Sequence, residues 1–145
     1  MRSLSAAVLA LAAAGCLAAA PAASGDPVEP GDAATAPVAD FVAAYRDAVL
    51  GLGESGHTPS EVRADRLTPE LNARLDAWAA QHPADPVFRT AEVPESWTVR
   101  AEGAAGGLAF ALVTERFGPA AAVHRVRYAV RRDDRAIVDL MDAPG

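Results

Sequence analysis

The sequence predicts an α+β domain in which two or three N-terminal helices pack on one face of a four-stranded antiparallel meander. Up to about residue 80, apolar residues recur every three or four positions, which is typical of helices that bury one side. From residue 96 the apolar period changes to two, the spacing of a strand with one buried face. Short turns containing glycine, proline or aspartate separate four such strands, which favours an antiparallel meander.

The first helix is expected to begin near Pro37, with Thr35 as its N-cap, and to end at the glycines of "GLGESG" at residues 51–56. Its apolar stripe consists of Val38, Phe41, Val42, Tyr45, Val49 and Leu52. The same six letters match the G-x-G-x-x-G pattern of dinucleotide-binding turns. That turn needs a strand before it and a helix directly after it, and the sequence predicts neither. We therefore interpret these glycines as a helix terminator.

Two capping sequences predict the next two helices. "TPSE" at residues 58–61 is a capping box with proline at the first helical position, and its helix should run to Arg66. "TPEL" at residues 68–71 should start another helix, with Thr68 as its N-cap. This helix should end before Pro83, because the residue that precedes a proline avoids helical geometry.

The four strands are expected at residues 97–102, 108–117, 123–132 and 136–141. In the third strand, three apolar residues face one way and three arginines the other: Val126, Tyr128 and Val130 against Arg125, Arg127 and Arg131. The apolar face should pack on the helices while the arginine face meets solvent. We expect pairing of these arginines with Glu102 or Glu115 on neighbouring strands.

The N-terminal residues 1–22 have the features of a secretory signal peptide. Arg2 supplies a positive start, residues 4–17 form a short apolar run, and "APA" at residues 20–22 is a cleavage site of the A-x-A type. This predicts an exported protein, periplasmic or secreted. "AAGC", which ends at Cys16, resembles a bacterial lipobox, so the alternative is lipidation of Cys16 and anchoring to the bacterial membrane.

After the signal peptide, residues 23–36 are rich in proline, glycine, alanine and acids, and are expected to form a flexible linker. Residues 37–145 then form a single α+β domain. Residues 23–96 carry 5 arginines and 13 acids, so their net charge is 5 − 13 = −8. Residues 97–145 carry 7 arginines and 6 acids, or 7 − 6 = +1. This charge balance argues against a nucleic-acid-binding protein, because binding nucleic acid requires a contiguous basic face.

Several segments together resemble a domain-of-unknown-function family of exported bacterial proteins. They are "FVAAYRDAV", "LTPELNARLDAW", "DPVFRTAE" at residues 85–92, "WTVRAE" and "VRYAVRRDDRAIVDL", and they span residues 37–141. The helix-first order also resembles the cystatin-like fold of the nuclear-transport-factor-2-like superfamily. The resemblance implies a small cone-like α+β domain in the envelope or outside the cell, and it implies no established reaction.

The sequence contains no convincing catalytic or metal-binding motif. His57, His82 and His124 fall in a loop, at a helix end and in a strand, without the spacing of a metal site. Ser55 does not lie in a G-x-S-x-G motif, and no base is indicated beside it. We therefore predict no catalytic residues, no metal and no cofactor.

The superfamily resemblance suggests where a ligand would bind. Such relatives often bind small hydrophobic molecules between the helix and the concave sheet, and some use a tyrosine and a carboxylate there for proton transfer. The matching candidates are Tyr45, Trp97, Tyr128 and Asp139. The alternative is structural: the tyrosines are core-edge aromatics with their hydroxyls at water, and Asp139 caps a turn or pairs with an arginine.

The leading hypothesis is an exported envelope protein with a non-catalytic domain that binds a small molecule or another protein. Its partner would be an envelope protein or a small hydrophobic ligand, and it would touch the membrane only through a lipid anchor at Cys16. Arg125, Arg127, Arg131 and Arg132 could bind an anion or an acidic partner, or could simply keep the sheet soluble. The rival hypothesis is a small-molecule enzyme of the isomerase or cyclase type, with a pocket between the first helix and the sheet.

Overall fold

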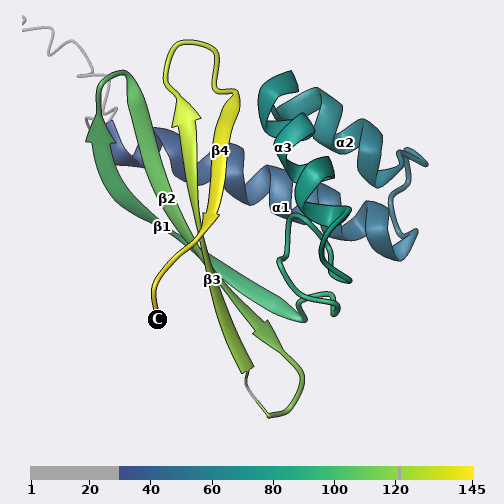
Figure 1. Cartoon of the computed structure of the whole chain (residues 1–145). Helices are drawn as coiled ribbons and strands as arrows, with labels where there is room; N and C mark the ends of the chain where they lie inside the picture. Colours follow the sequence, from purple (N-terminus) through teal and green to yellow (C-terminus); the bar gives the residue numbers. More distant parts are fainter. Residues whose placement is uncertain (1–29, 121) are drawn as a thin grey trace, which may run out of the picture.

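The computed structural model describes residues 30–120 and 122–145, and confirms an α+β fold (Figure 1). The predicted signal peptide, Cys16 and the first half of the predicted linker, residues 23–29, lie outside the described residues. The elements are η1 (Pro30–Ala34), α1 (Thr35–Leu50), α2 (Pro59–Arg66), α3 (Pro69–Ala79), β1 (Ser96–Ala105), β2 (Leu108–Phe117), β3 (Ala122–Arg131) and β4 (Ile137–Asp142). The strands form one antiparallel sheet in the order β1-β2-β3-β4, as a meander requires.

Helix α1 begins slightly earlier than the sequence predicts. Its N-cap is Ala34, and Thr35 lies inside the helix, where its hydroxyl donates to the Asp32 carbonyl at 2.8 Å. The preceding η1 packs against β1, and the Ala34 side chain is fully buried. Packed structure therefore starts before the boundary expected at residue 37. At the other end, Gly51 has φ 67° and caps the helix, which confirms its predicted role.

Helices α2 and α3 start as the capping sequences predict. The Thr58 hydroxyl accepts from the Glu61 amide, and the Glu61 carboxylate accepts in return from the Thr58 amide. The Thr68 hydroxyl accepts from the Leu71 amide at 3.3 Å. Between the two helices, the Thr68 amide donates to the Ile137 carbonyl at 3.0 Å, which attaches this connection to the β4 edge. Helix α3 thus lies beside β4, while α1 crosses one face of the sheet (Figure 1).

The strands agree with the predicted positions apart from the length of β1. This strand continues to Ala105, because a bulge between Ala101 and Ala104 lets the pairing with β2 resume. Gly103 in that bulge has φ 99°, a conformation that glycine adopts without strain. The turn between β1 and β2 therefore shortens to residues 106–107.

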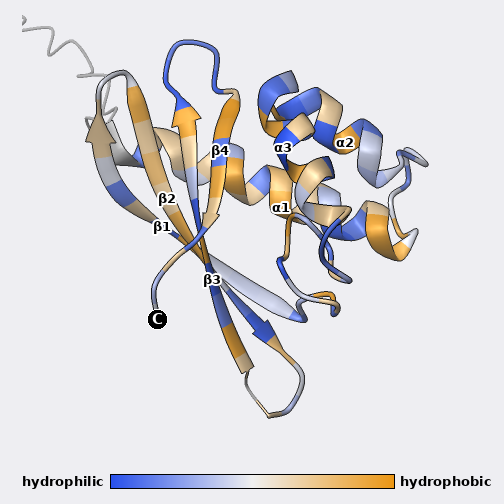
Figure 2. Ribbon diagram, viewed as in Figure 1, coloured by the Kyte–Doolittle hydropathy of each residue, from blue (hydrophilic) through white to orange (hydrophobic). Residues whose placement is uncertain are grey.

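The core lies between α1 and the inner face of the sheet. Ala109 and Ala111 on the central strand β2 are fully buried and small, so they leave room for rings from both sides. The rings of Phe41 and Tyr128 meet edge to face there, with centroids 6.3 Å apart. In the middle of β3, the exposed Arg125 and Arg127 alternate with the buried Val126 and Tyr128, as the period of two predicts, and blue and orange bands alternate along this strand in Figure 2.

Candidate functional site

A buried group of polar side chains lies in this core, between α1, the connection from α3 to β1, and strands β2 to β4. On the α1 side, the Tyr45 hydroxyl donates to Asp85 Oδ2 at 2.9 Å. The other carboxylate oxygen of Asp85 accepts from the amides of Val87 and Phe88 at 2.8 and 2.9 Å. Asp85 thus orders the start of a loop that no periodicity in the sequence describes.

Glu115 is the most unusual member of the group, because its side chain is fully buried. Neither carboxylate oxygen has a hydrogen-bond partner among the described residues. Glu115 lies on the inner face of β2 together with Ala109, Ala111 and Val113, because every second residue of a strand points to the same face. Of the two carboxylates expected to pair with the arginines, Glu115 does not, because the arginines occupy the opposite face, whereas Glu102 pairs with Arg127.

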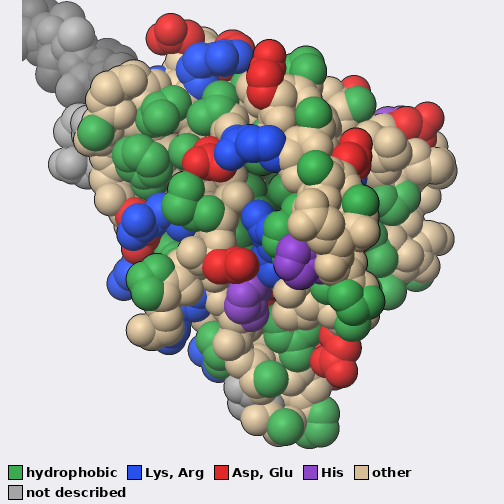
Figure 3. Space-filling view, in the orientation of Figure 1, with side chains coloured by type: hydrophobic (Ala, Val, Ile, Leu, Met, Phe, Trp, Pro, Cys, Tyr) green, Lys and Arg blue, Asp and Glu red, His purple; other side chains and the backbone are tan. Residues whose placement is uncertain are grey.

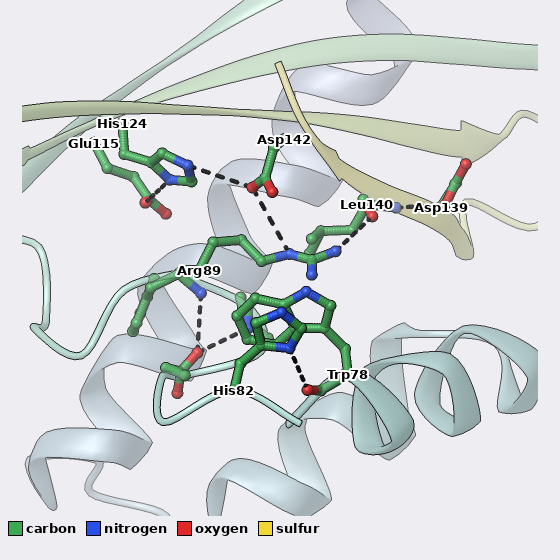
Figure 4. Close-up of polar contacts among 11 residues, drawn as sticks. Trp78, His82, Arg89, Glu115, His124, Asp139, Leu140 and Asp142 are labelled. Carbon is green, nitrogen blue, oxygen red and sulfur yellow. Dashed lines mark hydrogen bonds and ion pairs between the residues drawn. The ribbon is translucent and has the colours of Figure 1, made fainter. Parts of the chain in front are cut away.

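Glu115, His124 and Asp142 lie in a row, each beside the next (Figure 4). His124 lies directly opposite Glu115 in the β2–β3 register, and its Nδ1 is 3.6 Å from Glu115 Oε2. The second ring nitrogen, Nε2, is 3.3 Å from Asp142 Oδ1 at the end of β4. His124 is partly exposed and Asp142 is exposed, so the group reaches the surface through these two residues.

Arg89 reaches the same cluster from the loop. Its backbone has φ 61°, and its amide donates to the Asp85 carbonyl at 2.8 Å. The guanidinium donates from Nη2 to the Leu140 carbonyl at 3.2 Å, and Nε lies 3.9 Å from Asp142 Oδ1. The Arg89 guanidinium also lies over the Trp78 ring, with Cζ 4.5 Å from the ring centroid. The Trp78 ring in turn stacks on the His82 ring.

The pKa values of the buried groups follow from this setting. Burial, followed by the charges of Asp85 and Asp142, raises the pKa of Glu115 to about 8. Burial and Asp85 raise the pKa of Tyr45 above its ordinary value. Burial, followed by Glu115, raises the pKa of Tyr128 as well. At neutral pH all three groups are therefore mainly neutral.

The four candidate residues from the sequence have different surroundings. Tyr45 and Tyr128 approach each other through the ring of Phe41, with centroid distances of 5.7 and 6.3 Å. Both hydroxyls are buried rather than at water, so that expectation is wrong: large apolar neighbours cover both rings. The Tyr128 hydroxyl has no hydrogen-bond partner in the described part of the chain.

Asp139 and Trp97 lie apart from the two tyrosines. Asp139 Oδ1 is 3.1 Å from Arg74 Nη2, which confirms the expected pairing with an arginine. Trp97 stands opposite Glu115 in the β1–β2 register, and Arg46 lies 5.9 Å from its ring centroid. Trp97 also lines a hollow of about 410 Å³ between the start of α1 and β1.

The sequence reasoning missed Asp85 and Arg89, and assigned no site role to Glu115. One signal was available for Glu115. In "LAFALVTERF", residue 115 has the same parity as the alanines and valine that face the core. A glutamate at that position is either neutral or paired. Asp85 and Arg89 had no such signal.

The opposite face of the sheet carries the arginines. We define the arginine face as Arg100, Arg116, Arg125 and Arg127, all exposed, together with the residues between them. Glu102 forms ion pairs with two of these arginines: its carboxylate lies 2.6 Å from Arg127 Nε and 3.7 Å from Arg100 Nη2. Arg116 and Arg125 have no carboxylate partner among residues 30–120 and 122–145. Basic side chains gather over the strands at the left of Figure 3.

A hollow of about 670 Å³ opens on the arginine face. Thr98, Leu112 and Thr114 contribute to its lining, and residues 143–145 form another part of it. Two more hollows lie elsewhere, one of about 530 Å³ beside residues 51–57 and one of about 600 Å³ near Arg135. Neither Tyr45 nor Tyr128 lines any of these four hollows.

Within the described ranges, no group of three or more histidine, cysteine, aspartate or glutamate side chains could hold a metal ion. None of the helices there is long and apolar enough to cross a membrane. No family model, curated protein or solved structure matches the chain.

Proposed function

We propose that this chain is an exported envelope protein whose domain is a non-catalytic interaction module, and that its arginine face binds an extended acidic segment of another envelope protein. The observation that supports this most is the charge of the hollow on that face. Among the described side chains that line it, four are arginines and the single carboxylate is that of Glu102. Elsewhere the domain is acidic, since the whole chain has a net charge of −6. A basic face on an acidic protein selects acidic partners and keeps basic ones away.

The spacing of the arginines suits an extended segment. Arg125 and Arg127 are two residues apart on one face of β3, a separation of about 7 Å. An extended acidic peptide places alternate carboxylates at the same interval. Thr98 and Thr114, neighbours in the β1–β2 register, add hydroxyl groups beside Arg125. Because the surface is hollowed and bordered by residues 143–145, it suits a narrow chain better than a flat bilayer.

The test measures binding of octaglutamate to the folded protein by calorimetry at low and high salt. We expect binding that weakens with salt, and a loss of about tenfold in affinity when Arg116 and Arg125 are both changed to glutamine. The matched control changes Arg132 and Arg135 to glutamine, which removes the same charge beyond the opposite end of β3. Octaglutamine controls for the peptide backbone.

Equal affinity of the Arg116→Gln/Arg125→Gln protein and the control protein would overturn the proposal. Vesicles that contain phosphatidylglycerol serve as a second probe. If the protein binds these vesicles through Arg116 and Arg125 and ignores octaglutamate, then the partner is a lipid surface and an acidic peptide is the wrong partner.

Export is part of the same proposal and has its own test. The support is the arrangement of Arg2, the apolar run and "APA" at residues 20–22. Cell fractionation should recover the protein outside the cytoplasm. Cys16→Ser distinguishes the two routes: membrane association that depends on Cys16 supports lipidation, whereas unchanged release supports cleavage at the A-x-A site.

A second candidate, a small-molecule enzyme, is favoured by one observation. Tyr45, Tyr128 and Glu115 gather between α1 and the sheet, and the last two have polar atoms without partners among the described residues. Such groups are typical of sites for proton transfer. Titration with Nile red, a neutral hydrophobic dye, tests the idea by NMR. If neither tyrosine ring signal shifts at saturation, no pocket opens there and this candidate fails.

A further inference from the structure

A chain of contacts connects buried Glu115 to the arginine face on the other side of the sheet. His124 faces Glu115 with Nδ1 at 3.6 Å and Asp142 with Nε2 at 3.3 Å. Asp142 is the last residue of β4, and the next amide, that of Ala143, donates to the Arg125 carbonyl at 2.9 Å. Residues 143–145, which we name the C-terminal arm, then line the hollow beside Arg125 and Arg127.

The surroundings of Glu115 make its charge costly. Each packed element contributes titratable or charged groups nearby: Tyr45 from α1, Asp85 and Arg89 from the loop, His124 and Tyr128 from β3, and Asp142 from β4. The β1 residue opposite Glu115 is the uncharged Trp97, and the guanidinium of Arg46 in α1 lies over the Trp97 ring. The guanidinium of Arg89 is turned to Leu140 and Asp142, so Glu115 has no cation in contact within the described residues unless His124 is protonated.

Histidine can transmit the charge state of Glu115 because its two nitrogens have opposite roles in the neutral ring. In the structure Nδ1 and Oε2 are 3.6 Å apart, and neither atom has a hydrogen-bond partner among the described residues. A small approach of the two side chains lets a protonated Glu115 donate its hydrogen to Nδ1 of His124, which leaves the ring hydrogen on Nε2, facing the Asp142 carboxylate. Both contacts are then attractive. An ionised Glu115 instead requires the ring hydrogen on Nδ1. The bare Nε2 lone pair then faces Asp142, and that contact becomes repulsive.

We propose that the protonation state of Glu115 sets the tautomer of His124, and through Asp142 controls how firmly the C-terminal arm is held at the arginine face. This coupling would make the affinity for an acidic segment depend on pH, a consequence that rests on the proposed function. Protonated Glu115 holds the arm in place and completes the hollow. Ionised Glu115 removes the attraction between Asp142 and His124, and the arm is then held by the pairing of Asp142 with Val126, the Ala143 hydrogen bond and the more distant contact of Asp142 with Arg89.

The first experiment needs no variant. Nitrogen-15 NMR distinguishes the two neutral tautomers of His124 and its cation, and we would record it from about pH 6 to pH 9.5. The expected result is a change from the Nε2–H to the Nδ1–H tautomer, with a matching shift of the Ala143 and Gly145 amide signals. Retention of the Nε2–H tautomer throughout, or a His124 cation that persists when Glu115 ionises, would overturn the proposal.

The second experiment follows octaglutamate affinity over the same pH range, where glutamate side chains and arginines keep their charge. Wild-type affinity should fall by about threefold toward high pH, comparable to the loss of one exposed ion-pair contact. The Glu115→Gln protein has an amide that does not ionise and can donate to Nδ1 at every pH, so it should show a flat profile. Equal pH dependence in the two proteins would refute the coupling.

The two failures can be told apart. If octaglutamate does not bind at any pH, the proposed function fails, and the tautomer measurement still decides whether Glu115 controls His124 and the arm. If octaglutamate binds with a flat pH profile in the wild type, the interaction module stands and its control by Glu115 is wrong.

Discussion

The Tyr45 hydroxyl donates to Asp85 Oδ2 at 2.9 Å, whereas the Tyr128 hydroxyl, buried a short distance away, has no partner among the described residues. The two tyrosines share the Phe41 ring as a neighbour and differ mainly in this hydrogen bond. Because an unmade hydrogen bond at a buried group costs free energy, the two hydroxyls should affect stability in opposite ways.

Tyr45→Phe should therefore lower the free energy of unfolding by about 1–2 kcal/mol, the usual cost of a lost bond to a carboxylate. Tyr128→Phe removes only a buried hydroxyl, so we expect an unchanged or slightly higher free energy. Urea denaturation at neutral pH measures both. A Tyr128→Phe protein as destabilised as Tyr45→Phe would contradict the unpaired state of the Tyr128 hydroxyl.

Glu115 should make stability depend on pH. Its pKa in the folded protein is raised to about 8 from an ordinary value of 4.5. Between those values the folded state keeps a proton that the unfolded state has lost, so stability is greatest at low pH. The contribution of Glu115 to the free energy of unfolding should then fall by up to about 1.4 kcal/mol per pH unit as the pH rises above about 4.5, and this decline should end near pH 8.

Glu115→Gln isolates this contribution, because groups that do not contact Glu115 titrate equally in both proteins. As the pH rises from about 4.5 to 8, the unfolding free energy of the Glu115→Gln protein should increase relative to that of the wild type, because only the wild type has this titration. Urea denaturation at several pH values measures it. A difference that stays constant over this range would mean that Glu115 is ionised in the folded protein at neutral pH.

The features that the sequence predicted well are local ones. The capping box at Thr58, the N-cap at Thr68 and the end of α1 at Gly51 depend on residues within one helical turn. The contact between Tyr45 and Asp85 joins residues 40 apart, and the one between Arg89 and Leu140 joins residues 51 apart. Both depend on the path of an irregular loop, for which propensities give no direction.

Thr58 should contribute to the stability of α2 through its cap. Its hydroxyl and amide exchange hydrogen bonds with Glu61, and α2 has only 8 residues, so few other backbone bonds support it. Thr58→Ala should lower the unfolding free energy by about 1 kcal/mol. Ser60→Ala, at an exposed position in the same turn, is the control and should be neutral. Equal effects in urea denaturation would show that the cap is unimportant.

The glycines of "GLGESG" offer the last test, since only one of the first two needs to be glycine. Gly51 has φ 67°, and an added Cβ would meet no atom within 4 Å, so any cost of Gly51→Ala comes from backbone conformation alone. We expect a loss of about 1–2 kcal/mol. Gly53 has no such φ, and its added Cβ would meet only Ser55 Oγ at 3.9 Å, an ordinary contact. Gly53→Ala should therefore be neutral or slightly stabilising, because alanine restricts the unfolded chain. Urea denaturation separates the two, and a Gly53→Ala protein as unstable as Gly51→Ala would contradict the helix-terminator role assigned to Gly51.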